Sequence, residues 1–182
     1  LARWTLNQNG VIYGVAFDDS FSVRHMRAED EETAWKFRTS KYVDSDISEI
    51  YAHIIDDLKN SRTVLLTGTP CQISGVCKYL KVKRINTEKL YTCDNICHGV
   101  PSRKIWEDYI KILKTKYIAS DDEITHINMR SKKVSWREQV LDIRLKKGSV
   151  DSVISTFSFN KFFLSLYGNR PSCFHCRYTS YK

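Results

Sequence analysis

The chain has 182 residues, of which 42% are hydrophobic and 27% are charged, and its net charge is +8. This is the composition of an ordinary globular protein with a core, and it excludes a chain too polar to fold. No run of residues approaches the length of a membrane span and no signal peptide is visible, so we expect a cytoplasmic protein. The positive charge suits a phosphate cofactor, an acidic redox protein or a nucleic acid. Because the basic residues are scattered, they are explained best as solvated helix faces, and nucleic acid is not the expected partner.

The first third of the chain predicts a hairpin followed by two helices. Val11–Phe17 and Phe21–Arg27 flank a polar turn and predict the hairpin. A short helix is expected at Glu31–Phe37. A start that resembles a capping box, followed by apolar residues at helical spacing, predicts a longer helix over residues 46–58.

Residues 63–117 predict a strand, a helix, a second strand and a second helix. The strands are expected at Thr63–Leu66 and Leu90–Cys97, and both read as buried. Helices are expected at Cys71–Leu80 and over residues 103–117. This order is that of a βαβ unit, so the two strands should be parallel and adjacent.

The character of the sequence changes after residue 118. Three short strands with polar turns are expected at Ile124–Arg130, Gln139–Leu145 and Val150–Thr156, which predicts an antiparallel meander. An aromatic-rich helix is expected at Phe157–Tyr167, with Gly168 as its C-cap. The tail after Gly168 is expected to be a loop.

These elements predict an α/β fold, α+β-like overall, with a small parallel βαβ sheet flanked by helices and an antiparallel strand meander. We expect one domain over residues 1–182, divided into an α/β core (1–118), the meander (119–156) and a helix with a C-x-x-C tail (157–182). The chain starts at Leu1 and not at Met, so we expect a piece of a longer protein, truncated at both ends.

Six cysteines are a large number for a chain of this size outside the secreted class. Cys71 and Cys97 each follow the carboxyl end of a predicted parallel strand. Since these ends meet at one edge of a sheet, where open α/β sheets bind ligands, we expect the two cysteines to be neighbours in space. Cys77 lies on the apolar face of its helix and is expected in the core, and Cys93 is expected to be structural.

The C-x-x-C at Cys173 and Cys176 is spaced so that both sulfur atoms can reach one metal. With Cys71 and Cys97 it could complete a set of four thiolates, which holds either zinc or an iron–sulfur cluster. The spacing alone does not choose between these metals.

Two other kinds of protein stay open on the residues alone. One is a zinc-stabilised binding module with four cysteine ligands. The other is a thiol enzyme in which the helix N-terminus stabilises the Cys71 thiolate and His98 serves as its base. His25, His53 and His126 carry no signal, and no dinucleotide or P-loop motif is present.

Several motifs occur together in a fixed order. They are Gly10–Gly14 (GVIYG), Ser40–Ser45 (SKYVDS), Gly68–Gln72 (GTPCQ), Cys97–Ser102 (CHGVPS), Met129–Lys132 (MRSK) with Trp136, and Arg170–Cys176 (RPSCFHC). In this ordered set the chain resembles the coenzyme F420 hydrogenase/dehydrogenase beta-subunit family. The resemblance implies an oxidoreductase that binds FAD and a 4Fe-4S cluster. It also implies electron transfer with a ferredoxin or an upstream ferredoxin-like domain and with a small redox substrate, for which coenzyme F420 is one candidate.

The resemblance also implies roles for single residues. The cluster ligands would be Cys71, Cys97, Cys173 and Cys176. The segments around residues 40–45, 68–72 and 98–99 would contact FAD, with Lys41 at a phosphate and His98 also a catalytic candidate. The implied cofactor-binding residues are Ser40, Lys41, Tyr42, Ser45, Gly68, Thr69, Pro70, Gln72, His98 and Gly99.

The sequence departs from the family pattern in three respects. Family members often have glycine where Thr39 stands and glutamine where Asp44 stands, and a negative charge at Asp44 is expected to weaken pyrophosphate binding. A glycine-rich flavin segment that normally precedes this region, and a segment that normally follows the second C-x-x-C, are missing. We therefore expect this piece alone to bind FAD poorly and to lack its cluster.

Overall fold

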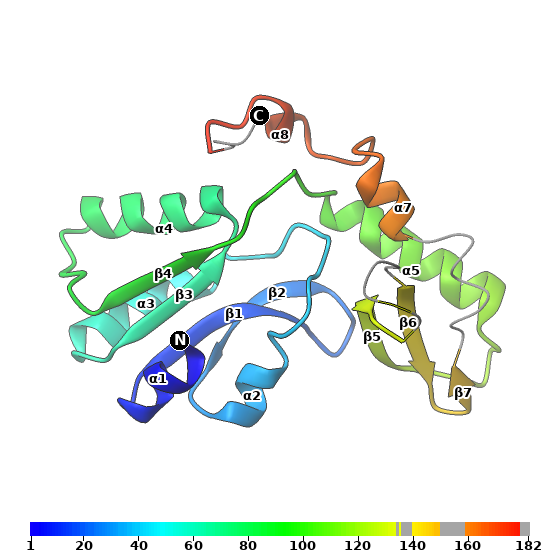
Figure 1. Cartoon of the computed structure of the whole chain (residues 1–182), viewed down its shortest axis with the longest axis horizontal. Coiled ribbons are helices and arrows are strands. Elements are labelled where there is room, and N and C mark those ends of the chain that lie inside the picture. The colour runs from blue at the N-terminus through cyan, green and yellow to red at the C-terminus, as the bar shows by residue number, and fades with distance from the viewer. Residues whose placement is uncertain (134, 136–139, 150–158, 179–182) are drawn as a thin grey trace. The chain divides into compact units, whose positions relative to one another are not determined.

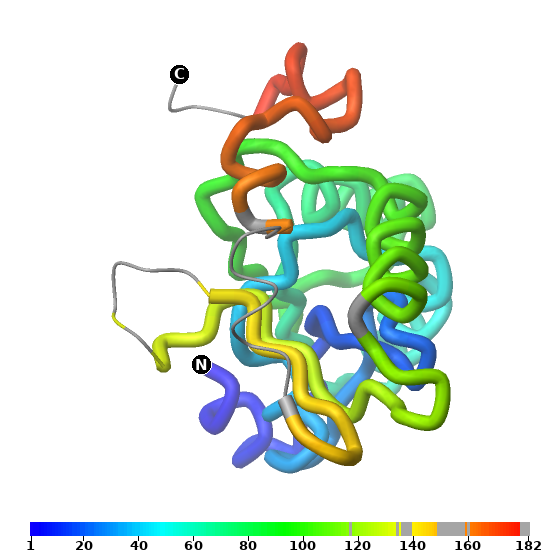
Figure 2. Tube along the Cα trace, turned by 90° about the vertical axis from the view of Figure 1, so that its right-hand side faces the viewer, coloured from blue at the N-terminus to red at the C-terminus, as the bar shows by residue number. Residues whose placement is uncertain are grey.

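The computed structural model describes residues 1–133, 135, 140–149 and 159–178 (Figures 1 and 2). The chain forms two compact units. The first comprises Leu1–Arg38, Ser45–Cys97 and Cys176–Lys182, and the second comprises Thr39–Asp44 and His98–His175. The predicted fold class is confirmed, because a mostly parallel sheet with helices and a separate antiparallel sheet are both present in the described residues.

The first unit is built on a four-stranded sheet in the order β2-β1-β3-β4 (Figure 1). Its strands are β1 (Val11–Phe17), β2 (Val23–Ala28), β3 (Val64–Gly68) and β4 (Leu90–Asp94). β1 and β2 form the predicted antiparallel hairpin, and β3 pairs in parallel with both β1 and β4. The predicted βαβ unit is therefore confirmed.

Helices cover both faces of this sheet. α3 (Ile50–Lys59) and α4 (Pro70–Val82) pack on one face, where alternate strand residues such as Val11, Tyr13 and Leu66 point toward them. α1 (Ala2–Asn7) and α2 (Glu31–Trp35) lie on the other face, against Ile12 and Leu65 (Figure 1). The alternation of burial along β1 and β3 follows from the two-residue period of a strand.

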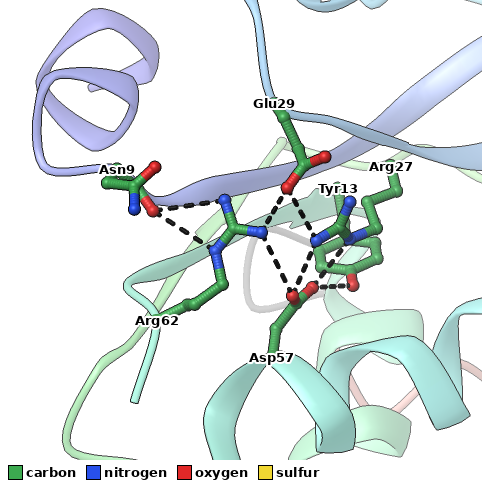
Figure 3. A network of polar contacts seen from close by, with 6 residues as sticks. All are labelled: Asn9, Tyr13, Arg27, Glu29, Asp57 and Arg62. Atoms are coloured by element: carbon green, nitrogen blue, oxygen red, sulfur yellow. Dashed lines mark hydrogen bonds and ion pairs between the residues drawn. The ribbon is translucent and has the colours of Figure 1, made fainter. Parts of the chain in front are cut away.

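A network of charged side chains around the buried Asp57 ties α3 to the hairpin (Figure 3). Asp57 of α3 is 5% exposed and accepts hydrogen bonds from the Tyr13 hydroxyl at 2.5 Å and from Arg27 Nε and Nη2 at 2.8 and 2.7 Å. Glu29 accepts from Arg27 and from Arg62, and Arg62 also donates to the Asn9 carbonyl. Burial by itself would raise the pKa of Asp57, but the hydrogen bonds from Arg27 and Tyr13 outweigh it and keep this pKa below its ordinary value.

Two helices of the first unit differ from the prediction. α3 begins at Ile50 and not at Asp46, because the Asp46 carboxylate accepts from the Ser48 backbone and hydroxyl and closes a turn there. α1 has no counterpart in the prediction, since six residues offer too short a pattern for a helical period.

The prediction of a buried second strand that runs to Cys97 is wrong. β4 ends at Asp94, and its residues Tyr91–Asp94 are exposed. β4 lies at the edge of the sheet, so it is flanked by only one strand, and Tyr91 is in contact with the Trp4 ring. Apolar composition alone does not distinguish such an edge strand from a central one.

The second unit combines helices with a three-stranded antiparallel sheet. The strands are β5 (Ile124–Ser131), β6 (Val140–Leu145) and β7 (Gly148–Ser149), whose adjacent runs can be followed in Figure 2. The helices are α5 (Arg103–Tyr117), α7 (Phe159–Leu164) and α8 (Pro171–Phe174). The Trp106 and Tyr109 rings of α5 pack against Phe159. The strand predicted at Val150–Thr156 lies outside the described residues.

Two predictions in the second unit are wrong. Gly168 is not the C-cap of α7, which ends at Leu164. The left-handed residue after it is Leu166 at φ +65°, and Gly168 is buried under the Phe162 ring, where a Cβ atom would lie 2.0 Å from it. The tail is not a simple loop, because Pro171 starts the short helix α8, as proline can at a first helical position.

Candidate functional site

The Gly68–Gln72 stretch forms the turn between β3 and α4. Thr69 is the N-cap of α4 and Pro70 is its first residue, so the Cys71 sulfur lies in the first turn of the helix. Gln72 completes a capping box, with its side-chain oxygen accepting from Thr69 N at 3.1 Å and from Thr69 Oγ1 at 2.9 Å. The Thr69 hydroxyl also lies 3.2 Å from Cys71 Sγ.

The amide nitrogen of Gln72 begins a series of hydrogen bonds that leads to the buried His25. Gln72 Nε2 donates to Ser45 Oγ at 2.9 Å, and Ser45 Oγ lies 3.0 Å from His25 Nδ1. His25 Nε2 in turn lies 3.0 Å from the Thr67 carbonyl. A Cβ atom at Gly68 would come within 3.1 Å of His25 Nε2, so the turn packs closely on the imidazole.

His25 is the residue that sequence reasoning missed here. It is 3% exposed and lies on the same face of β2 as Val23, which is 1% exposed. The signal that could have found it is the alternation of inward and outward side chains along the strand, which places His25 on the buried face with Val23. A buried polar ring needs hydrogen-bond partners. Burial lowers the pKa of His25, and the hydrogen bond to the Thr67 carbonyl offsets only part of this.

The lowered pKa of His25 predicts a pH dependence of stability. Below about pH 6.5 the unfolded chain takes up a proton that the buried ring does not, so the free energy of unfolding should fall as the pH drops. Urea unfolding at pH 7.5 and pH 5.5 should show this for the native chain, and a smaller change for His25→Gln. His53→Gln, at an exposed position, should retain the full native dependence. Equal pH dependence in both variants would contradict the assignment to His25.

β4, the strand that leads to Cys97, lies beside β3 and parallel to it, as the sequence predicted. β3 and β4 pair in parallel from Val64↔Leu90 to Gly68↔Asp94. Cys71 and Cys97 therefore each stand three residues beyond the last register pair, at the carboxyl ends of adjacent strands. A close approach of the two sulfur atoms stays a prediction.

The turn after Cys97 is tied to the segment that leads into the C-x-x-C. Asn169 Nδ2 donates to the His98 carbonyl at 3.1 Å, and Asn169 forms a bridge with Pro101. Gly99 has φ +104°, and its missing Cβ leaves room for the Asn169 side chain, which would lie 2.2 Å from that atom. The His98 side chain is exposed. Within the second unit, this links the residues directly after Cys97 to those just before Cys173.

Asp44 has a partner for its charge. Arg170 Nη1 lies 3.0 Å from Asp44 Oδ1, and the backbones of both residues bond to the same turn, at Pro101 and Val100 respectively. The Asp44 carboxylate is therefore paired with a guanidinium, and the expected weakening of pyrophosphate binding by its charge stays a prediction.

The residue two positions after Cys176 contacts the first turns of α4. The Tyr178 hydroxyl lies 3.0 Å from Ser74 Oγ and 3.3 Å from Lys78 Nζ, and the hydrogen bond from Ser74, with that from Lys78, lowers the pKa of Tyr178. Ser74 follows Cys71 by three residues on that helix. Within the first unit, this links the residues after the C-x-x-C to α4, whose first turn contains Cys71.

All six cysteines lie in the described part of the chain, and no disulfide joins them. Cys71, Cys97, Cys173 and Cys176 are half-buried. Cys77, expected in the core, is also only half-buried, and Cys93 is exposed. Among the described residues, no three His, Cys, Asp or Glu side chains are grouped so that they could hold a metal ion. The donor set of four half-buried thiols nevertheless matches the chemistry that zinc and iron–sulfur clusters require.

The remaining predicted cofactor residues lie in the loop over residues 39–44. The Tyr42 ring stacks on Phe163 with the centroids 4.5 Å apart, and its backbone N–H lies 3.1 Å from Met129 Sδ. Ser40 and Lys41 are half-buried, and burial lowers the pKa of Lys41 to about 8. An anionic group beside Lys41 would raise this pKa again, because it stabilises the ammonium form.

Thr39, which opens this loop, has φ +66°. A β-branched residue is strained in the left-handed region, whereas glycine adopts it freely. We expect Thr39→Gly to raise the free energy of unfolding by about 1 kcal/mol, after allowance for the greater freedom of glycine in the unfolded chain. Urea denaturation measures this. Thr87→Gly, at an exposed position outside the left-handed region, should instead lower stability, and a loss in both variants would rule out strain at Thr39.

Residues 61–182, about two thirds of the chain, match the family of the C-terminal part of the coenzyme F420 hydrogenase/dehydrogenase beta subunit. The chain belongs to this family. The match includes the four cysteines of the predicted ligand set and the turn at Gly68–Gln72, and it begins after the loop at residues 39–44. The family name is that of hydrogenase and dehydrogenase subunits, which are oxidoreductases.

The structure is also similar to a chain of the xenon-derivatised F420-reducing [NiFe] hydrogenase complex from Methanosarcina barkeri. The TM-score is 0.55 at 17% sequence identity, over 95% of this chain and 56% of that chain. At this identity the likeness shows the fold alone. This chain thus spans 56% of the length of that relative. None of the curated proteins matches the chain. No helix in the described residues has the length and apolar character to cross a membrane.

Proposed function

We propose that the chain is an electron-transfer domain of an oxidoreductase that binds FAD and a 4Fe-4S cluster. The observation that carries the proposal is that a residue on each side of the C-x-x-C contacts a residue near one of the two strand-end cysteines. The Tyr178 hydroxyl accepts a hydrogen bond from Ser74, which follows Cys71 by three residues in α4. The Asn169 side chain donates to the carbonyl of His98, the residue directly after Cys97. Each link lies within one compact unit.

Cys71, Cys97, Cys173 and Cys176 would hold the cluster. Cys71 stands in the first turn of α4, where the free N–H groups of a helix N-terminus would face the negative charge of a bound cluster. The cluster would supply one-electron transfer, which is chemistry that the protein's own groups lack. Cluster ligands must be reduced thiols, which a reducing compartment maintains, so we propose that the protein lies in the cytoplasm.

The flavin would lie against the residues at 40–45, 68–72 and 98–99. Lys41 would contact a phosphate, since an anion stabilises an ammonium group that burial disfavours. Asn169 Oδ1 is buried and has no hydrogen-bond partner among the described residues, so it can accept from a donor on a ligand at the His98–Gly99 turn. Ser45 and Gln72 are engaged with each other and would act on the flavin by holding the turn in place.

The physiological partners follow from the same proposal. A ferredoxin or an upstream ferredoxin-like domain would exchange electrons at one end, and a small redox substrate at the other. Coenzyme F420 is the first candidate for that substrate, because the family takes its name from it. The net charge of +8 would favour an acidic ferredoxin.

Reduction of the bound flavin tests this function. The full-length protein is loaded with FAD and iron–sulfide under anaerobic conditions, and reduced coenzyme F420 or reduced ferredoxin is added. The oxidised flavin absorbance should bleach with one of these donors and recover with an acceptor. A protein that holds flavin but is reduced by neither donor would contradict the proposed electron transfer.

A further inference from the structure

We propose that Thr69, Gln72, Ser45 and His25 form a directed hydrogen-bond relay that positions the Cys71 sulfur, with the Thr69 hydroxyl as the group that acts on it. The residues come from three separate segments of the first unit, namely β2, the end of the loop before α3, and the turn into α4. This role deepens the proposed function and rests on it wherever the sulfur is treated as a cluster ligand.

The direction of the relay follows from donors and acceptors. The Thr67 carbonyl can only accept, so His25 donates to it through Nε2–H, and Nδ1 is left as an acceptor. The Ser45 hydroxyl therefore donates to Nδ1 and accepts from Gln72 Nε2. The lowered pKa of His25 agrees with the neutral ring that this arrangement needs.

The orientation of the Gln72 amide is fixed from its other side. The backbone N–H of Thr69 can only donate, so the atom that it meets at 3.1 Å must be the carbonyl oxygen of Gln72. The amide nitrogen of Gln72 then faces Ser45, where it meets both the hydroxyl and the backbone carbonyl, the latter at 3.2 Å. Each polar atom of Gln72 is thus assigned a single role.

The Thr69 hydroxyl stands at the end of this chain, 3.2 Å from Cys71 Sγ. Opposite a thiol it accepts from S–H and donates its own proton to the Gln72 oxygen at 2.9 Å. Opposite a thiolate it turns that proton to the sulfur, and the Gln72 oxygen keeps the bond from the Thr69 backbone. The hydroxyl can therefore serve both forms of the sulfur with no change in the position of heavy atoms.

A donor on a ligating sulfur has a defined effect on a cluster. Hydrogen bonds to cluster sulfur atoms help to set the reduction potential. The reduced cluster carries one more negative charge and gains more from the bond, so the Thr69 hydroxyl should raise that potential. Thr69 is a positioning residue in this role, since it acts through Cys71.

Two measurements test the relay. The first is the ¹⁵N spectrum of the His25 ring in the native chain without cofactors, which should show the proton on Nε2 and none on Nδ1. The second compares Thr69→Val with Thr69→Ser in the reconstituted protein by a redox titration of the cluster. The valine variant lacks the hydroxyl and should have a lower reduction potential, and the serine variant should restore the native value.

The outcomes separate this inference from the proposed function. A His25 proton on Nδ1, or equal potentials in the native and valine proteins, would overturn the relay and leave the cluster in place. A native protein that takes up no iron and sulfide would overturn the proposed function, and the His25 spectrum would still decide the relay. If Thr69→Val does not fold, the spectrum of the native chain gives the decision alone.

Discussion

We expect Asp57→Asn to lower the free energy of unfolding by about 3 kcal/mol. Asp57 is 5% exposed, and its carboxylate accepts hydrogen bonds from Nε and Nη2 of Arg27 and from the Tyr13 hydroxyl (Figure 3). An amide keeps the shape of the side chain but cannot accept from all three donors, and it leaves the Arg27 guanidinium without its main counter-charge. Thermal unfolding should show a midpoint lower by roughly 6–12 °C for a chain of this size.

Asp56 provides the matched control for this prediction, because it is the neighbouring residue of α3 and is exposed. Asp56→Asn should change stability by less than about 0.5 kcal/mol. The pKa of Asp57 is below its ordinary value, so its contribution is present above about pH 4 and is lost as the pH falls further. The difference between the native chain and Asp57→Asn should therefore shrink in acid. Equal effects of the two variants at pH 7 would contradict the role of the network.

The second large effect is expected for Cys71→Ser in the reconstituted protein. A serine hydroxyl is a hard, weakly acidic ligand that rarely replaces a cluster thiolate, so most of the bound iron should be lost. Iron and acid-labile sulfide, measured per chain after removal of unbound metal, give the result. The loss should be several-fold.

Cys77→Ser is the control, since Cys77 is a half-buried cysteine of the same helix outside the proposed set. It should keep the native iron content. Iron that survives in Cys71→Ser, or that is lost equally from both variants, would show that Cys71 is not a specific ligand.

The parts of the fold that have a strong period were predictable. The hairpin, the parallel pair β3 and β4, and helix α5 lie where alternation and helical spacing put them. The ends of helices and strands were harder to predict. The Asp46 side chain, for example, closes a turn where the sequence predicted the start of a helix. The exposure of β4 was not predictable, since it depends on the strand's place at the edge of the sheet.

The candidate site divides in the same way. The placement of Cys71 and Cys97 beyond adjacent strand ends followed from the βαβ order alone. The contact between His25 and Ser45 could not be predicted from the sequence, because 20 residues separate the two. Their link to Cys71 depends on how β2 packs on the turn before α4. The pairing of Arg170 with Asp44 is equally non-local, so the partner of this charge could not be found from the sequence.

The metal content of the full-length protein, purified or reconstituted without oxygen, tests the central proposal most directly. Iron, acid-labile sulfide, zinc and flavin are measured in one sample. A 4Fe-4S flavoprotein should contain about four iron and four sulfide per chain together with flavin. Zinc with neither iron nor sulfide would contradict the proposal in favour of a zinc-binding module with four cysteine ligands. A protein without metal whose activity is lost on thiol alkylation would contradict it in favour of a Cys71 enzyme.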